Sequence, residues 1–96
     1  MEENCEKFFL TLSNKLKISI VESLRGSEKS VSELSGDIGE ERSKVSHALQ
    51  DLLRCSLVEV RREGRKRVYS LNEDTIEPLL DLVDEHVEKY CAECEW

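Results

Sequence analysis

The side chains best suited to chemistry lie on one face of a helix that apolar spacing predicts over about residues 41–54. The buried stripe of this helix would be Val45, Ala48, Leu49, Leu52 and Leu53. The opposite face carries polar and basic side chains, namely Ser43, Lys44, Ser46, His47, Gln50 and Arg54. A serine hydroxyl can hydrogen-bond a base edge or a phosphate, and a glutamine can pair with an adenine edge. We therefore predict a DNA-reading face. The alternative is an ordinary solvent-exposed helix face, and His47 has the further alternative of a backbone or packing contact.

A second basic group follows at residues 61–67, where Arg-Arg-Glu-Gly-Arg-Lys-Arg holds five basic residues against one acidic residue. Alternating apolar and polar residues flank it, so we predict a β-hairpin over about 58–71 with this segment at its tip. The candidate phosphate or minor-groove contacts are Arg61, Arg62, Arg65, Lys66 and Arg67. Residues 61, 65 and 67 need not share a face with 62 and 66, so we expect about three of the five to contact DNA. Such binding would fall steeply with salt; the alternative is an edge strand protected by charge.

The cysteines could make a thiol site. Cys91 and Cys94 form a Cys-x-x-Cys pair about one helical turn apart, which could bind zinc or another thiophilic ion. Because structural zinc usually takes four ligands, Cys5, His86 or acidic residues across a dimer would have to complete the set. The alternative is a terminal segment with incidental cysteines. Cys55 is predicted to be a small buried residue.

Composition limits the class of protein. At 96 residues, the chain is expected to form a single domain over 1–96. The longest apolar runs are far too short to cross a membrane, and the acidic start lacks the basic region of a secretory signal. We therefore expect a cytoplasmic protein with reduced thiols. We expect no enzyme, because there is no glycine-rich phosphate loop and no nucleophile with a base at suitable spacing.

The net charge of −7 opposes nucleic-acid binding unless charge is segregated along the chain. Acidic residues concentrate in 2–6 and 73–95, on either side of the basic segment. A solvated face in so acidic a chain would be expected to carry Glu and Asp, yet the polar face of helix 41–54 carries only Asp51, which lies off its centre. This segregation favours a local site for phosphate.

The remaining elements follow from periodicity and turn residues. Apolar spacings of three and four predict one helix from Phe8 to Leu24, with an extra short helix near 3–8 as an alternative. Ser30 or Ser32 could cap a short helix that ends at Gly39. A last helix, capped by Asn72 or Asp74, is predicted over about 74–90. The fold class is therefore mainly α with a small β-hairpin, in the order α-α-α-β-β-α.

These residues resemble the ArsR-type (arsenical and metal-responsive) winged helix-turn-helix family over about residues 8–90. The resemblance rests on Ser43-Lys44-Val45-Ser46-His47-Ala48-Leu49, Leu52-Leu53, Leu57-Val58, Arg62-Glu63-Gly64-Arg65 and Tyr69-Ser70-Leu71. It implies a recognition helix at 41–54, a wing at 58–71, and a homodimer held by the first and last helices. Two recognition helices would then enter successive major grooves of a pseudo-palindromic operator. The broad apolar face of the last helix, which includes Leu82, independently favours a dimer interface.

The chain departs from the family pattern in three places. A glycine commonly stands where this chain has Ser56, so a left-handed turn there would be strained, or the turn is built differently. Segment 31–37 lacks the paired cysteines of the family's site on the third helix. Asp84-Glu85-His86 is similar to the start of a last-helix metal site, but the downstream ligand positions lie beyond Trp96.

The sequence as a whole predicts a dimeric, sequence-specific DNA-binding regulator of transcription, acting as a repressor. No cofactor is expected to be required, and zinc, another thiophilic ion or an oxidant is a candidate effector at Cys91, Cys94, Cys5 and His86. Two alternatives stay open. One is a winged-helix module that docks proteins, which an isoelectric point near 4.9 would suit. The other is a DNA-binding regulator without a small-molecule effector.

Overall fold

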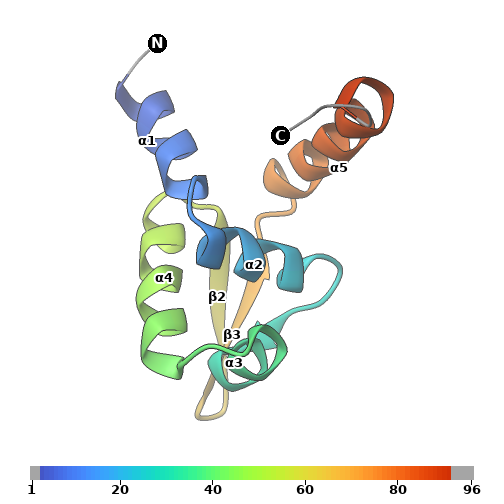
Figure 1. Cartoon of the computed structure of the whole chain (residues 1–96). Coiled ribbons are helices and arrows are strands. Elements are labelled where there is room, and N and C mark those ends of the chain that lie inside the picture. The colour runs from blue at the N-terminus through green and yellow to red at the C-terminus, as the bar shows by residue number, and fades with distance from the viewer. Residues whose placement is uncertain (1–2, 92–96) are drawn as a thin grey trace.

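The computed structural model describes residues 3–91 of the chain (Figure 1). Its elements are α1 (Glu3–Leu12), α2 (Lys15–Leu24), β1 (Lys29–Ser30), α3 (Val31–Ile38), α4 (Arg42–Arg54), β2 (Val58–Glu63), β3 (Lys66–Leu71) and α5 (Ile76–His86), followed by a π-helical turn over Val87–Cys91. The strands form one antiparallel sheet in the order β1-β3-β2. The expected fold class, mainly helical with a small hairpin, is confirmed.

The single helix expected over residues 8–24 is wrong, because the chain breaks at Ser13-Asn14 and forms α1 and α2. Asn14 is extended (φ −148°, ψ 126°), and its Oδ1 accepts a hydrogen bond from the Lys17 N–H at 3.1 Å. An asparagine in this geometry satisfies a backbone donor at a helix start. The apolar periodicity runs through the break, so it could not reveal a cap that begins a second helix.

One apolar cluster joins α2, α3, α4, the sheet and the start of α5. Its fully buried members include Ile20, Leu34, Leu49 and Leu57. The predicted stripe on α4 is part of it: Val45, Leu49 and Leu52 are fully buried, and Ala48 is 5% exposed. Because α4 is fixed along this stripe, its opposite face is held toward solvent.

The segment before α3 contains a short strand that was not expected. Lys29 and Ser30 pair with Tyr69 and Val68 of β3, where the sequence indicated only a loop. Ser30 then caps α3 as predicted: its Oγ accepts from the Glu33 N–H, and the Glu33 carboxylate accepts from the Ser30 N–H. Gly39 ends α3 with a φ of 75°. Local chemistry therefore predicted the cap, whereas the strand depends on β3 from far along the chain.

The predicted wing at 58–71 is confirmed by β2 and β3, which pair Glu63 with Lys66 across a two-residue turn. Gly64 has a φ of 62°, which suits the first position of a type II′ turn. The chain enters the wing through Ser56, whose φ of 55° makes it the only non-glycine residue with a positive φ within residues 3–91. The left-handed turn expected there is present, with a serine in place of a glycine.

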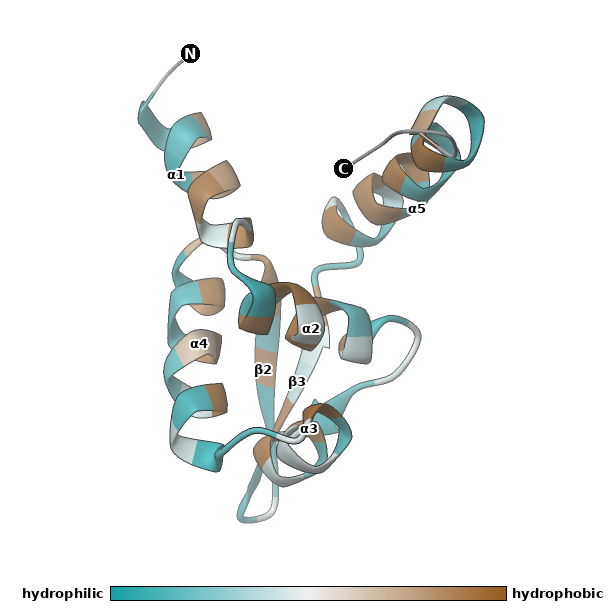
Figure 2. Cartoon of the chain, viewed as in Figure 1, coloured by the Kyte–Doolittle hydropathy of each residue, from teal (hydrophilic) through white to brown (hydrophobic). Residues whose placement is uncertain are grey.

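Helix α5 begins at Ile76, two residues later than predicted, because Asn72 organises a turn ahead of it. The Asn72 Oδ1 accepts hydrogen bonds from the N–H groups of Asp74 (2.9 Å) and Thr75 (3.3 Å). Helices α1 and α5 diverge from the body of the molecule, formed by α2–α4 and the sheet, at the end opposite the wing turn, and both contain hydrophobic residues (Figure 2). No helix within residues 3–91 is long and apolar enough to span a membrane.

Candidate nucleic-acid interface

The outward face of α4 presents the side chains that the sequence predicted. Ser43, Lys44, His47, Gln50 and Arg54 are exposed, and Ser46 is half-buried. The side chains of Lys44 and Arg54 are 61% and 76% exposed, at opposite ends of the helix. One helix face therefore combines hydrogen-bonding side chains with a cation near each end of the helix.

Lys44 and Arg54 both have carboxylate partners. The Lys44 Nζ lies 3.6 Å from Glu40, and the Arg54 Nη1 lies 3.1 Å from the Asp51 Oδ1. The other Asp51 oxygen lies 3.0 Å from Lys17 on α2. The hydrogen bond from Lys17 is the main cause that holds the pKa of Asp51 below its ordinary range. Asp51 thus joins α2 to α4 and orients Arg54, and exposed ion pairs such as that of Arg54 add little to stability.

The strand register decides which wing residues share a face. Arg62 of β2 lies directly opposite Arg67 of β3, whereas Lys66 lies opposite Glu63. The grouping expected from residue parity, with 67 beside 61 and 66 beside 62, is therefore wrong. Partners in this hairpin have numbers of opposite parity, which alternation within one strand could not reveal. Within residues 3–91, no ion pair engages Arg62, Arg65, Lys66 or Arg67.

Arg61 differs from the other basic wing residues because it is already paired. Its Nε lies 3.1 Å from Glu28 in the α2–β1 loop, and a second nitrogen bonds the same carboxylate. Glu63 lies 3.0 Å from Arg61 as well. The hydrogen bond from Arg61 lowers the pKa of Glu28. Arg61 is therefore a structural tie between the wing and the body.

The elements that carry the candidate DNA contacts lie at one end of the molecule. In Figure 1, the start of α4 and the turn between β2 and β3 lie at the end opposite α1 and α5. A shallow hollow of about 240 Å³ lies between the start of α3 and the wing, lined by Ser30, Val31, Ser32, Arg65, Lys66 and Arg67. Sequence reasoning missed this proximity of Ser32 to the wing. The capping pair at Ser30 and Glu33 was the available signal for a helix start there.

The candidate metal ligands lie at the other end. Cys5 is exposed, Cys91 is half-buried, and Cys94 lies outside the described residues. The His86 ring lies 5.1 Å from the ring of Tyr90. Residues 3–91 contain no cluster of three or more metal-ligating side chains. Asp84, in the motif similar to a last-helix metal site, has its carboxylate 2.7 Å from Arg25.

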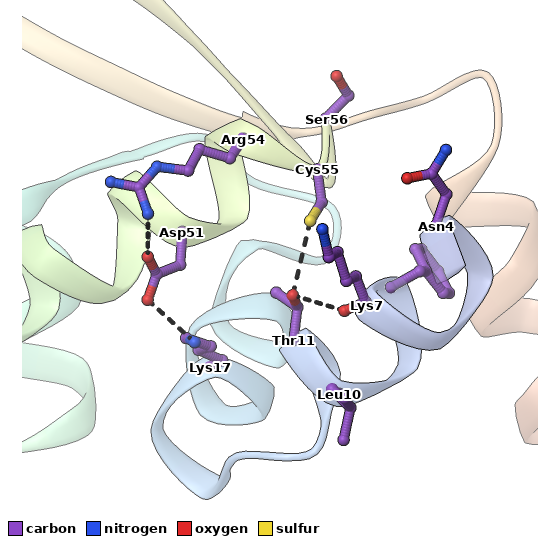
Figure 3. A pocket seen from close by; sticks show the side chains of 10 residues that line it. Asn4, Lys7, Leu10, Thr11, Lys17, Asp51, Arg54, Cys55 and Ser56 are labelled. Carbon is purple, nitrogen blue, oxygen red and sulfur yellow. Dashed lines mark hydrogen bonds and ion pairs between the residues drawn. The ribbon is translucent and has the colours of Figure 1, made fainter. Parts of the chain in front are cut away.

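Cys55 lines a hollow of about 700 Å³ between α1 and the end of α4 (Figure 3). Its Sγ lies 3.5 Å from the Thr11 Oγ1, and Lys7, Lys17 and Arg54 line the same hollow. Cys55 was predicted to be a small buried residue; it packs against the core, but its thiol is only half-buried. Helix α1 packs on the core through Phe8 and Leu12 and leaves this hollow open beside Cys55.

Comparison with known proteins gives consistent matches. The family described as the N-terminal domain of the methanogenesis regulatory protein FilR1 matches residues 3–83. The HTH-type transcriptional regulator Rv0081 of Mycobacterium tuberculosis is 40% identical over 75 residues, which cover 77% of this chain and 66% of that protein. The regulator NmtR of the same organism is 38% identical over 77 residues, covering 80% of this chain and 64% of NmtR. The chain thus spans just under two thirds of the length of these curated relatives.

Solved structures match over a larger share of the chain. The crystal structure of Rv0081 superposes with a TM-score of 0.83 at 32% identity, covering 92% of this chain and 89% of that one. The fragment 1–100 of Mb0332 from Mycobacterium bovis superposes with a TM-score of 0.81 at 28% identity, covering 92% and 85% of the two chains. That fragment is described as a homodimeric winged helix-turn-helix DNA-binding domain of a possible ArsR-family regulator.

Proposed function

This chain belongs to the ArsR-type family of winged helix-turn-helix transcriptional regulators, and we propose that it binds duplex DNA as a homodimer and represses transcription. The observation that carries the proposal is the outward face of α4 lying at the same end as a wing whose tip cations Arg62, Arg65 and Arg67 have no ion-pair partner within residues 3–91. This combination supplies a helix for a major groove and cations for the flanking backbone.

Base reading belongs to the outward face of α4. Ser43 in the first turn and His47 and Gln50 further along are exposed and offer donors and acceptors on one face. The basic wing residues Arg62, Arg65, Lys66 and Arg67 contact phosphates or the minor groove beside it. Because Arg61 is held by Glu28, four of the five basic wing residues remain for DNA, where the sequence led us to expect about three.

The dimer forms through α1 and α5. These helices expose large apolar side chains, with Phe9 58%, Leu10 64% and Leu82 62% exposed. A second copy of the chain supplies matching apolar surface, and the described homodimer of the Mb0332 fragment supports the formation of a homodimer. Two copies of α4 then face successive major grooves, and the operator is a pseudo-palindrome with half-sites about one helical turn apart.

The effector is a thiophilic metal ion, such as zinc, or an oxidant acting at Cys91 and Cys94, with Cys5 and His86 as further ligands. The position of Cys91 at the end of the π-helical turn that follows α5 supports this, because ligation there would act on the dimer helices. Binding of a ligand changes DNA affinity only through such a coupling between two sites. The protein acts in the cytoplasm, where its DNA is. A regulator without an effector is the second candidate, since residues 3–91 alone do not assemble a ligand cluster.

The test is selection of bound duplexes from a random-sequence library by the full chain. The parent should enrich a two-fold-related sequence, and Ser43→Ala/Gln50→Ala should lose or alter that sequence while the wing still holds DNA. The matched control is Lys7→Ala/Lys89→Ala, which changes two exposed residues on the far helices. A parent that enriches no sequence and binds no duplex would contradict the proposal and favour a protein-docking module.

A further inference from the structure

We propose that Arg25 is a positioning residue that sets the angle of α5 against the DNA-reading body, and with it the half-site spacing that the dimer accepts. This inference rests on the proposed function, because half-site spacing has meaning only for a dimer that binds DNA. The position of α5 itself can be measured without DNA.

Arg25 follows the buried Leu24 at the end of α2 and reaches across to α5. Its Nη2 lies 3.0 Å from the Asp81 Oδ1 and 2.7 Å from the Asp84 Oδ2. A third carboxylate, Glu22, lies 3.6 Å from Nη1. The hydrogen bond to Asp84 is the main cause that raises the pKa of Arg25 above its ordinary value. One guanidinium therefore holds two carboxylates that are one turn apart on α5.

The position of this contact along α5 allows it to control the angle of the helix. The first half of the helix packs on the body through Ile76, Leu79 and Leu80. Every side chain from Asp81 to Tyr90 is exposed in the single chain. The two ion pairs of Arg25 therefore lie just beyond Leu80, the last of these packed residues. From this point on, α5 is free to tilt relative to the body.

A small tilt would matter at the far end of the molecule. The chain is 44 Å along its longest axis, with the wing turn opposite α5. A tilt of roughly 10° moves the reading end by at most roughly 8 Å, about two base-pair steps of about 3.4 Å. If the dimer holds α5 fixed, the angle that Arg25 sets becomes a distance between the two copies of α4.

Arginine is suited to this contact and lysine is not. A guanidinium is planar and can hold two carboxylates in fixed directions, whereas an ammonium is a compact charge on a flexible stem. Exposed ion pairs add little to the free energy of unfolding. The expected effect of losing Arg25 is thus on geometry, with thermal stability nearly unchanged.

The experiment uses the full-chain dimer and two readouts. Residual dipolar couplings report the orientation of α5 relative to α2–α4 without DNA. Affinity is measured for the duplex selected by the parent, and for duplexes whose two half-sites are moved apart or together by one and two base pairs. The variants are Arg25→Gln, Arg25→Lys and the exchange Arg25→Asp/Asp84→Arg. Lys89→Gln is the matched control, because it removes one cation whose ion pair stays within the C-terminal helix.

We expect Arg25→Gln to remain dimeric, to broaden the α5 orientation, and to lose about tenfold in affinity for the parent's best spacing while losing little at neighbouring spacings. Arg25→Lys should fall between, the charge exchange should recover part of the preference, and Lys89→Gln should match the parent. Unchanged dipolar couplings, or an equal loss at every spacing, would overturn the proposal. If the parent binds no duplex, the proposed function fails, and the dipolar couplings still decide whether Arg25 orients α5.

Discussion

Arg62 and Arg67 lie directly opposite each other across the hairpin, so that two guanidinium groups share one face of the wing. Like charges at directly opposed positions destabilise a strand pair. Within residues 3–91, neither arginine has a carboxylate within ion-pair distance. A bound phosphate would relieve this repulsion, so the pair costs stability in the free protein and contributes affinity in the complex.

The first prediction concerns this arginine pair. Replacing both by Gln (Arg62→Gln/Arg67→Gln) should raise the free energy of unfolding by about 0.2–1 kcal/mol, because a like-charge pair is removed. The same change should weaken DNA binding and reduce the slope of log affinity against log salt by up to about 3.6 for a dimer that loses four phosphate contacts. Urea denaturation and fluorescence anisotropy at several salt concentrations measure the two effects.

The control for the arginine pair is Arg61→Gln. Because Arg61 is held by Glu28 and Glu63, its loss should lower stability slightly and leave the salt slope almost unchanged. If the salt slope of Arg62→Gln/Arg67→Gln is unchanged, these wing arginines do not contact phosphate and the wing is not part of the interface.

A second prediction concerns Ser56, which has a φ of 55° before the wing. This conformation costs a residue with a Cβ about 1–2 kcal/mol. Glycine adopts it without strain, but glycine loses more conformational entropy on folding. Ser56→Gly should therefore raise the free energy of unfolding by up to about 1 kcal/mol. Thermal and urea unfolding measure this, with Ser56→Ala as the control that keeps the strain. Equal stability of the Gly and Ala variants would contradict the strain.

The sequence predicted what depends on neighbours along the chain. Helix 42–54 and the hairpin at 58–71 agree with their predicted bounds, because apolar spacing and turn residues act locally. The break at Asn14 is also local, but continuous apolar periodicity on both sides concealed it. Contacts between distant residues could not be foreseen: Arg61 meets Glu28 from 33 positions away, and Arg25 meets Asp81 from 56. Which carboxylates pair with an arginine depends on the completed fold. The sequence could therefore not distinguish Arg61, which is paired, from the other basic wing residues, which have no ion-pair partner within residues 3–91.

A third prediction concerns pH. The folded-state pKa of Asp51 is lowered chiefly by Lys17 from an ordinary value of 3.8. A carboxyl group of this kind stabilises the fold above its unfolded-state pKa, and the contribution is lost as pH falls through the lower folded-state pKa. Stability should therefore fall with acid below about pH 4, and less so in Lys17→Met.

Urea unfolding between about pH 6 and about pH 3 measures this difference. Lys15→Met is the matched control, since Lys15 is an exposed lysine on the same helix. A parent and a Lys17→Met variant that lose stability equally over this range would show that the Lys17–Asp51 pair has no such role.

A fourth prediction concerns the thiols. Metal or oxidant should change the DNA affinity of the reduced parent by about 5- to 150-fold, the usual range for coupled sites. Cys91→Ser/Cys94→Ser should abolish the response, whereas Cys55→Ser should retain it. Anisotropy titrations with Zn(II), Cd(II), arsenite and peroxide provide the measurement. A full response in the double variant would exclude these cysteines as the sensor.

The most direct test of the central claim is amide chemical-shift mapping of the labelled full chain with its selected duplex. If α4 and the wing of a homodimer read DNA, the largest changes should fall in residues 42–54 and 61–67, with α1 and α5 little affected. Changes centred on α1 or α5, or none at saturating duplex, would contradict the assignment of this interface.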